Sequence, residues 1–366
     1  MRRGSLAVLL LLAACTPRPE HPGHAESRFF EILRNPVSGA FSAVSKSPFD
    51  GQADTLDLAT PLRRLVVMST SHVGFLDALG CDSVIVGVSG LDFVTAPEVR
   101  DRAARGQVAE VGYGAGLDYE RIVALHPDLL VAYTVSAVRP PFLAKLESLG
   151  VRVFLVHEHL EADPLGRASY LRLFGAMTGR LDRADSLFAR IETRYRALQS
   201  RLPADARRRK VLLNIPYKDQ WFVPGGESYV SKLIRDAGGV VLGAVPGQGR
   251  SGVISLERAF ALSDSADCWL NPGWCRTLSQ LQGENPLFPA MLDRIRDNAR
   301  RAGSDPEAVV WNDNLRLNGK GGNDFWESGV THPDLVLEDL LRILHPECLP
   351  PREPEAAPFR YYRKVE

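Results

Sequence analysis

The chain has 366 residues, with 44 basic and 44 acidic side chains and therefore no formal net charge. Hydrophobic residues make up 45% and charged residues 24%, a balance that is typical of a folded protein and excludes wholesale disorder. The length suits two domains of ordinary size, and the lack of a basic surplus argues against nucleic acid as a partner.

The first residues predict export followed by attachment to a membrane. Two arginines precede the apolar run 6–12, which is too short to span a bilayer, and small residues then lead to Cys15. This order is similar to the lipobox of bacterial lipoproteins, in which the cysteine is lipidated, although a signal peptide with an incidental cysteine is the alternative. We expect a lipoprotein signal peptide at 1–14, lipidation at Cys15, a tether over 15–27 and a periplasmic or extracytoplasmic protein that is not embedded in the membrane.

Three strand-like runs follow the tether, at 29–33, 41–45 and 55–58, and Asp50-Gly51 favours a tight turn between two of them. We interpret 28–62 as a peripheral β segment to which the sequence assigns no chemistry.

From residue 64 the chain alternates short apolar strands with amphipathic helices, and strands of this kind indicate parallel sheets covered on both faces. In the first half we expect strands at 65–68, 84–86, 128–133 and 151–156, and helices at 71–79, 117–125 and 140–149. In the second half we expect strands at 210–213, 267–270 and 309–311, and helices at 228–237, 255–262 and 334–344.

Between the halves, apolar residues at three- and four-residue spacings predict one amphipathic helix over 181–202, which would be about 30 Å long. The predicted fold class is therefore α/β, with two parallel-sheet lobes joined by a long rigid helix and a ligand cleft between them. The expected boundaries are 63–163 for the N-terminal lobe, 164–203 for the connecting helices, 204–348 for the C-terminal lobe and 349–366 for a tail.

No catalytic constellation emerges from the motifs. Residues 247–252 match G-x-G-x-x-G, but a dinucleotide site needs these glycines between a strand and its helix, so we interpret them as a loop. His157 and His159 invite a zinc interpretation, yet no H-E-x-x-H accompanies them and we assign no metal ligand. Cys268 and Cys275 could pair in an oxidising compartment, although free thiols are favoured and the question stays open.

Aromatic side chains gather where strands end or loops begin, and ligands of parallel α/β sheets bind beyond the carboxyl ends of strands. Rings offer large contact areas to a bulky ligand, whereas the alternative is ordinary packing. The residues concerned are Tyr113, Tyr133, Trp221, Trp269, Trp274 and Trp326.

Several segments, taken in order, resemble the helical-backbone periplasmic binding proteins, which serve ABC importers for iron-siderophores, haem and vitamin B12. The resemblance covers about 64–346 and implies a binding protein, not an enzyme, with no cofactor of its own. The segments that carry it are 64–67, 84–89, 117–122, 126–131, 223–228 and 324–337.

The family docks on its permease through one acidic residue in each lobe, and the matching positions are Glu120 and Glu257, which could otherwise be solvated residues near helix N-termini. Resemblance to the B12-binding member implies ring contacts with the ligand, although two tyrosines stand where that member has tryptophans. The implied contacts are Tyr113, Tyr133, Trp221 or Phe222, and Trp326, with Asp324 and Glu327 as polar groups of the cleft.

We therefore expect a lipid-anchored, monomeric binding protein that passes an iron-siderophore, haem or cobalamin to the membrane subunits of an ABC permease, without choosing among these ligands. Two alternatives remain: an exported metal-dependent enzyme using His157 and His159, and a receptor for a small metal ion. The segment 275–322 is longer than the family pattern and could reshape the pocket.

Overall fold

The computed structural model describes residues 27–351 and 359–366. The expected signal peptide, Cys15 and most of the tether lie outside these ranges, as does part of the expected tail. Among the helices of the described ranges, none combines the length and the apolar character that a membrane crossing requires.

The N-terminal lobe contains a five-stranded, fully parallel sheet. Every residue of its three central strands is buried, because helices cover both faces, and this explains their unbroken apolar runs. The strands, in spatial order, are β6 (Ala109–Glu110), β5 (Ile85–Val88), β4 (Leu65–Val67), β7 (Leu129–Ala132) and β8 (Val153–Leu155). The helices are α1 (Thr70–Ala78), α2 (Pro97–Ala104), α3 (Tyr119–Ala124) and α4 (Pro141–Ser148).

The C-terminal lobe contains a second five-stranded sheet, which is parallel except for the edge strand β15, a two-residue strand from the chain's end that was not predicted. Its strands, in spatial order, are β11 (Gly239–Val241), β9 (Arg209–Leu213), β13 (Cys268–Leu270), β14 (Val310–Asn312) and β15 (Arg363–Lys364). The helices are α8 (Tyr229–Asp236), α9 (Leu256–Ser263), α10 (Leu278–Glu284), α11 (Phe288–Arg301) and α13 (Pro333–Leu344), and a ribbon pairs β10 (Trp221–Val223) with β12 (Gly252–Ile254).

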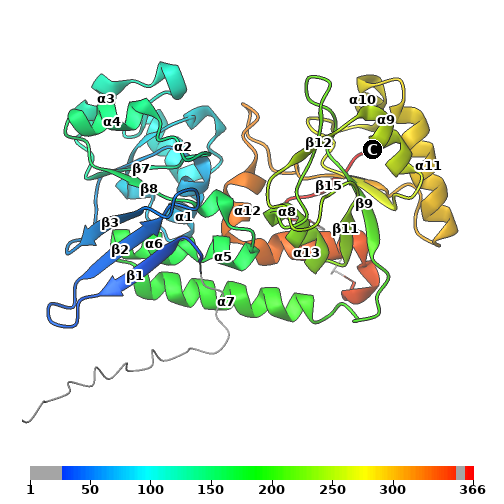
Figure 1. Ribbon diagram of the computed structural model, residues 1–366, viewed down its shortest axis with the longest axis horizontal. Helices are drawn as coiled ribbons and strands as arrows, with labels where there is room; N and C mark the ends of the chain where they lie inside the picture. The colour runs from blue at the N-terminus through cyan, green and yellow to red at the C-terminus, as the bar shows by residue number, and fades with distance from the viewer. Residues whose placement is uncertain (1–26, 352–358) are drawn as a thin grey trace, which may run out of the picture.

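One long helix, α7 (Leu181–Gln199), runs beneath both lobes (Figure 1). It packs against α6 (Tyr170–Thr178) of the first lobe and against α13 of the second. Its buried residues repeat at three- and four-residue spacings, which confirms the amphipathic pattern read from the sequence. The two-lobed α/β fold is therefore confirmed.

The chain returns to the first lobe after β14. The Asn318 side-chain amide donates to the carbonyl oxygens of Asp92 and Val94, and the helix α12 (Ser328–Thr331) packs on α1. The expected C-terminal lobe, 204–348, thus includes a segment that contacts the N-terminal lobe. We call the segment from the end of β14 to the end of α12 the second crossing, and it joins the lobes independently of α7.

The peripheral β segment forms a three-stranded antiparallel sheet, as the sequence suggested. We call it the N-terminal sheet; its strands are β1 (Phe30–Arg34), β2 (Phe41–Lys46) and β3 (Ala53–Leu58). Strand β1 packs on α6, where the rings of Phe30 and Tyr170 lie 4.6 Å apart. The sheet is therefore part of the N-terminal lobe's surface.

Candidate functional site

A cavity of about 810 Å³ lies between the lobes, and we call it the inter-lobe cavity. Both lobes, the N-terminal sheet and the second crossing contribute to its lining. The residues that line it include Arg28, Phe29, Pro48, Phe49, His159, Glu161, Arg167, Asn214, Glu227, Tyr229, Arg250, Asn271 and Trp326. A space of this size is typical of sites that enclose a small organic ligand.

The carboxyl ends of three strands meet this cavity. Asn214 follows β9 and Asn271 follows β13, with left-handed φ angles of 69° and 56°, and His159 lies shortly after β8. Asparagine tolerates this conformation better than most residues, which explains its presence at both strand ends. Neither asparagine was predicted to line the site, although their position directly after apolar strands was a usable signal.

Of the aromatic residues expected to contact ligand, Trp326 lines the cavity and is 42% exposed. Tyr113 is 73% exposed and Phe222 is 37% exposed, but neither is among the lining residues. Tyr133 is half-buried, with its ring 5.2 Å from that of His159, so it packs behind a lining residue.

Trp221 is a core residue in this structure. Its ring stacks on Trp269 at 5.9 Å and meets Phe288 edge-on, and its Nε1 donates to the carbonyl oxygen of Leu213 at 2.8 Å. The Trp269 ring nitrogen likewise donates to the carbonyl oxygen of Asn214 at 2.7 Å. The two tryptophans therefore support the end of β9 from inside the lobe and do not face the cavity.

Asp324 and Glu327 are buried and tie the second crossing to the N-terminal lobe instead of facing the cavity. Asp324 accepts hydrogen bonds from Arg316 and from the Thr95 hydroxyl. Glu327 accepts from the backbone N–H groups of Thr95 and Ala96, at 2.8 and 2.6 Å. Glu327 therefore satisfies two backbone donors of the loop before α2, and Asp324 binds the Thr95 hydroxyl of the same loop, so both residues next to Trp326 are anchored to the N-terminal lobe.

Burial of Glu327 makes the stability of the folded protein depend on pH, because it raises the pKa of this carboxyl to about 7. Between pH 4.5 and 7 the native state then holds a proton that the unfolded chain releases, so stability falls as the pH rises through this window. We expect Glu327 to account for up to about 3 kcal/mol of that fall. Urea unfolding of the wild type and of Glu327→Gln at pH 5 and pH 8 measures it: the fall in stability between the two pH values should be smaller in the variant by about this amount, and an equal fall in both proteins would contradict the assignment.

A second buried acid lies behind the cavity. Glu158 accepts a hydrogen bond from the Ser71 hydroxyl at 2.8 Å, while ring nitrogens of His72 and His159 lie 3.7 Å away and the Arg167 guanidinium 3.9 Å away. Burial alone would raise the pKa of Glu158, but these neighbours outweigh it and hold the pKa well below its usual range. Glu158 is therefore negatively charged, and it lies next to His159 and Arg167, which both line the cavity.

The expected alternative metal ligands, His157 and His159, do not form a ligand set with a third residue among the described residues. Burial and the nearby His159 lower the pKa of His157 to about 4, so His157 is neutral at physiological pH. The Nε2 of His159 lies 3.1 Å from the carbonyl oxygen of Thr134.

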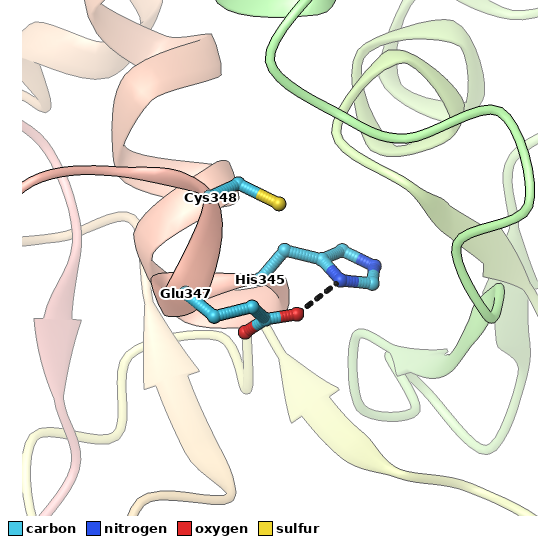
Figure 2. A group of neighbouring side chains, drawn as sticks. All are labelled: His345, Glu347 and Cys348. Carbon is cyan, nitrogen blue, oxygen red and sulfur yellow. Dashed lines mark hydrogen bonds and ion pairs between the residues drawn. The ribbon is translucent and has the colours of Figure 1, made fainter.

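Figure 2 shows a different cluster, at the turn after α13, in which ligand atoms of His345, Glu347 and Cys348 lie within 4.8 Å of one another. The two ring nitrogens of His345 already face the Glu347 carboxylate at 3.0 Å and the Gly238 carbonyl oxygen at 3.4 Å. Burial, helped by the charge of Glu347, raises the pKa of Cys348, whereas the thiolate is the form that binds metals. None of the three side chains lines the inter-lobe cavity.

The G-x-G-x-x-G segment at 247–252 connects β11 to β12 and opens no helix, so the dinucleotide interpretation is excluded and the loop interpretation is confirmed. Parts of this loop line the cavity. Cys268 and Cys275 are buried free thiols in the structure. The segment 275–322 forms α10, α11 and β14 and the start of the second crossing.

Glu120 and Glu257 are both exposed, each in the first turn of a helix capped by an oxygen side chain, Asp118 for α3 and Ser255 for α9. Hydrogen bonds from its own backbone N–H and from Ser255 lower the pKa of Glu257. The helices α3 and α9 belong to different lobes and lie on the side of the molecule opposite α7 (Figure 1). The two helices that carry Glu120 and Glu257 therefore lie on one side of the molecule, one in each lobe.

Comparison with known proteins places this geometry in a family. A family model described as periplasmic binding protein matches residues 65–290. An uncharacterized lipoprotein of Methanocaldococcus jannaschii is 25% identical over 303 residues, which are 80% of this chain and 67% of that protein. The iron(3+)-hydroxamate-binding protein FhuD of Bacillus subtilis is 24% identical over 202 residues, 54% of each chain.

A solved structure supports the fold. The periplasmic heme binding protein of Pseudomonas aeruginosa superimposes with a TM-score of 0.56 at 21% identity, covering 80% of this chain and 96% of that one. It shares the two-lobed arrangement described above.

Proposed function

Since the chain belongs to the periplasmic binding protein family, in which the members deliver a ligand to ABC permeases, we propose that it captures a bulky iron chelate, haem or cobalamin for such a permease. Family membership makes it a binding protein and not an enzyme. We propose a bulky ligand because the inter-lobe cavity has a volume of about 810 Å³ and is bordered by both lobes.

The lining suits a large ligand that is bound without being changed. Trp326 offers a partly exposed indole ring, and Phe29, Phe49 and Tyr229 add further rings around the same space. Aromatic faces give large contact areas at little entropic cost, so rings on several sides favour a rigid ligand such as a macrocycle or a ferric chelate. The relatives named for ferric hydroxamate and heme point to the same group of ligands.

The proposal includes a monomer that is periplasmic or extracytoplasmic and attached to a membrane through a lipid on Cys15. The order of basic, apolar and small residues before Cys15 supports it, and the matching protein of M. jannaschii is itself named a lipoprotein.

A titration of intrinsic fluorescence tests the function. Haem, cyanocobalamin and several ferric siderophores are added to the purified protein, and we expect one of them to bind in a 1:1 ratio with a dissociation constant on the order of micromolar or tighter. Trp326 lines the cavity, so its fluorescence should be quenched. In Trp326→Phe the quenching should shrink, while equilibrium dialysis still detects the ligand. Recovery of the ligand chemically changed, or binding of no member of the panel, would contradict the proposal.

A further inference from the structure

The N-terminal sheet borders the inter-lobe cavity, although it precedes the residues that match the family model. Arg28 and Phe29 reach the cavity from the start of β1, and Pro48 and Phe49 reach it from the turn between β2 and β3. The cavity therefore has a third side, which the two lobes alone would not supply.

The start of this sheet is held in place by a buried acid. The Glu161 carboxylate, only 2% exposed, accepts hydrogen bonds from the Ser27 hydroxyl at 2.5 Å and from the Arg28 backbone N–H at 2.8 Å. The Phe29 ring meets His157 edge-on at 6.5 Å. These contacts fix the backbone that carries Arg28 and Phe29, so ordering them against a ligand costs little conformational entropy.

The cavity lining carries more positive charge than its own partners neutralise. Among residues 27–351 and 359–366, the guanidinium groups of Arg28 and Arg250 have no hydrogen-bonded or ion-paired partner. Arg167 is 7% exposed, stacks on the Tyr229 ring at 4.9 Å, and its Nε has no hydrogen-bond partner. A buried guanidinium nitrogen without an acceptor is costly, so this site is suited to an acceptor supplied by a ligand.

The acids of the lining are already engaged. Glu161 receives the Ser27 and Arg28 donors, and Glu227 pairs with Arg235 at 3.2 Å. Arg167 lies 3.9 Å from the buried Glu158 carboxylate, so the positive charge without an ion-paired partner comes from Arg28 and Arg250, in two separate parts of the chain.

We propose that the N-terminal sheet is part of the ligand-binding site, and that Arg28, which lines the same cavity as Arg167 and Arg250, selects ligands that carry negative charge on their outer edge. Phe29 and Phe49 contact the apolar body of the same ligand. This inference rests on the proposed function and narrows it to anionic ligands such as haem, with its carboxylates, or a ferric tricatecholate. An unpaired guanidinium forms strong, directional hydrogen bonds with a carboxylate or catecholate oxygen, which explains the selection.

The test compares Arg28→Gln with Arg28→Lys and with Arg34→Gln, a matched control on the same sheet whose side chain is exposed and does not line the cavity. The probes are haem and ferric enterobactin, which are anionic, and ferrichrome and cyanocobalamin, which carry no net charge. Affinities are measured by equilibrium dialysis, and thermal unfolding checks that each variant is folded. We expect the wild type to prefer an anionic probe, and Arg28→Gln to weaken that probe by about tenfold or more.

Arg28→Lys should lose less affinity than Arg28→Gln, and Arg34→Gln should equal the wild type. A wild type that binds only the uncharged probes, or an Arg28→Gln variant that keeps its affinity for the anionic probe, overturns this inference while the proposed function stands. Equal weakening of charged and uncharged probes also overturns it, because the contact would then be one of shape. If no probe binds to the wild type, the proposed function fails and the inference fails with it.

Discussion

Reversing the charge of both Glu120 and Glu257, as Glu120→Arg with Glu257→Arg, is expected to abolish ligand transport while leaving ligand affinity unchanged. Both side chains are exposed, neither lines the inter-lobe cavity, and their helices lie on the side opposite α7 (Figure 1). Two carboxylates, one in each lobe, can fix the orientation of the protein on a basic permease surface and speed the encounter. After reversal, each introduced arginine would meet a basic permease surface, and like charges across an interface cost several kcal/mol.

The measurement is uptake of the bound ligand into proteoliposomes that contain the permease, together with affinity by equilibrium dialysis. The matched control is Asp182→Arg with Asp297→Arg, which changes the net charge equally at two exposed acids, the first in α7 and the second in α11. We expect the control to transport normally. Normal transport by the Glu120 and Glu257 variant would remove the docking assignment, and a loss of affinity in it would show that the defect lies in binding.

Much of the secondary structure was predictable because the information is local, although the helices α2, α10 and α11 were not predicted. The strands β4, β5 and β7 are buried on both faces, so their sequences are continuously apolar, and α7 buries one stripe, so its sequence is amphipathic. The short strand β15 was not predictable in this way, because its pairing with β14 is a contact across distant parts of the chain.

The site was less predictable, for a physical reason that Trp221 illustrates. Along β10, Trp221 and Val223 are buried and Phe222 is exposed, as the alternation of a strand requires. The pattern states that the two neighbouring rings point to opposite faces, but it does not state which face borders a cavity. That depends on how the lobes are placed, which also determines that Arg28 and Asn271 share one space.

Asp324 and Glu327 show a related limit. A polar residue near a cleft is a reasonable candidate for ligand contact, and resemblance to the family suggested both. In the structure they accept hydrogen bonds from residues more than 200 positions earlier, the Thr95 hydroxyl and the backbone N–H groups of Thr95 and Ala96. Unpaired backbone donors of a distant loop leave no mark on the sequence around their acceptors.

Replacing Gly74 by alanine is expected to destabilise the protein by about 2 kcal/mol or more, the opposite of the usual effect of this change inside a helix. Gly74 lies within α1, and a Cβ there would come 2.3 Å from the backbone carbonyl oxygen of Glu327, so α1 and α12 would have to separate.

The control is Gly283→Ala in α10, where a Cβ meets nothing within 4 Å and alanine should be neutral or stabilising. Urea unfolding gives the free energies, and ligand affinity should also fall in Gly74→Ala because Trp326 precedes the displaced α12. Equal stability of the two variants would contradict the close packing of α1 against the backbone of Glu327.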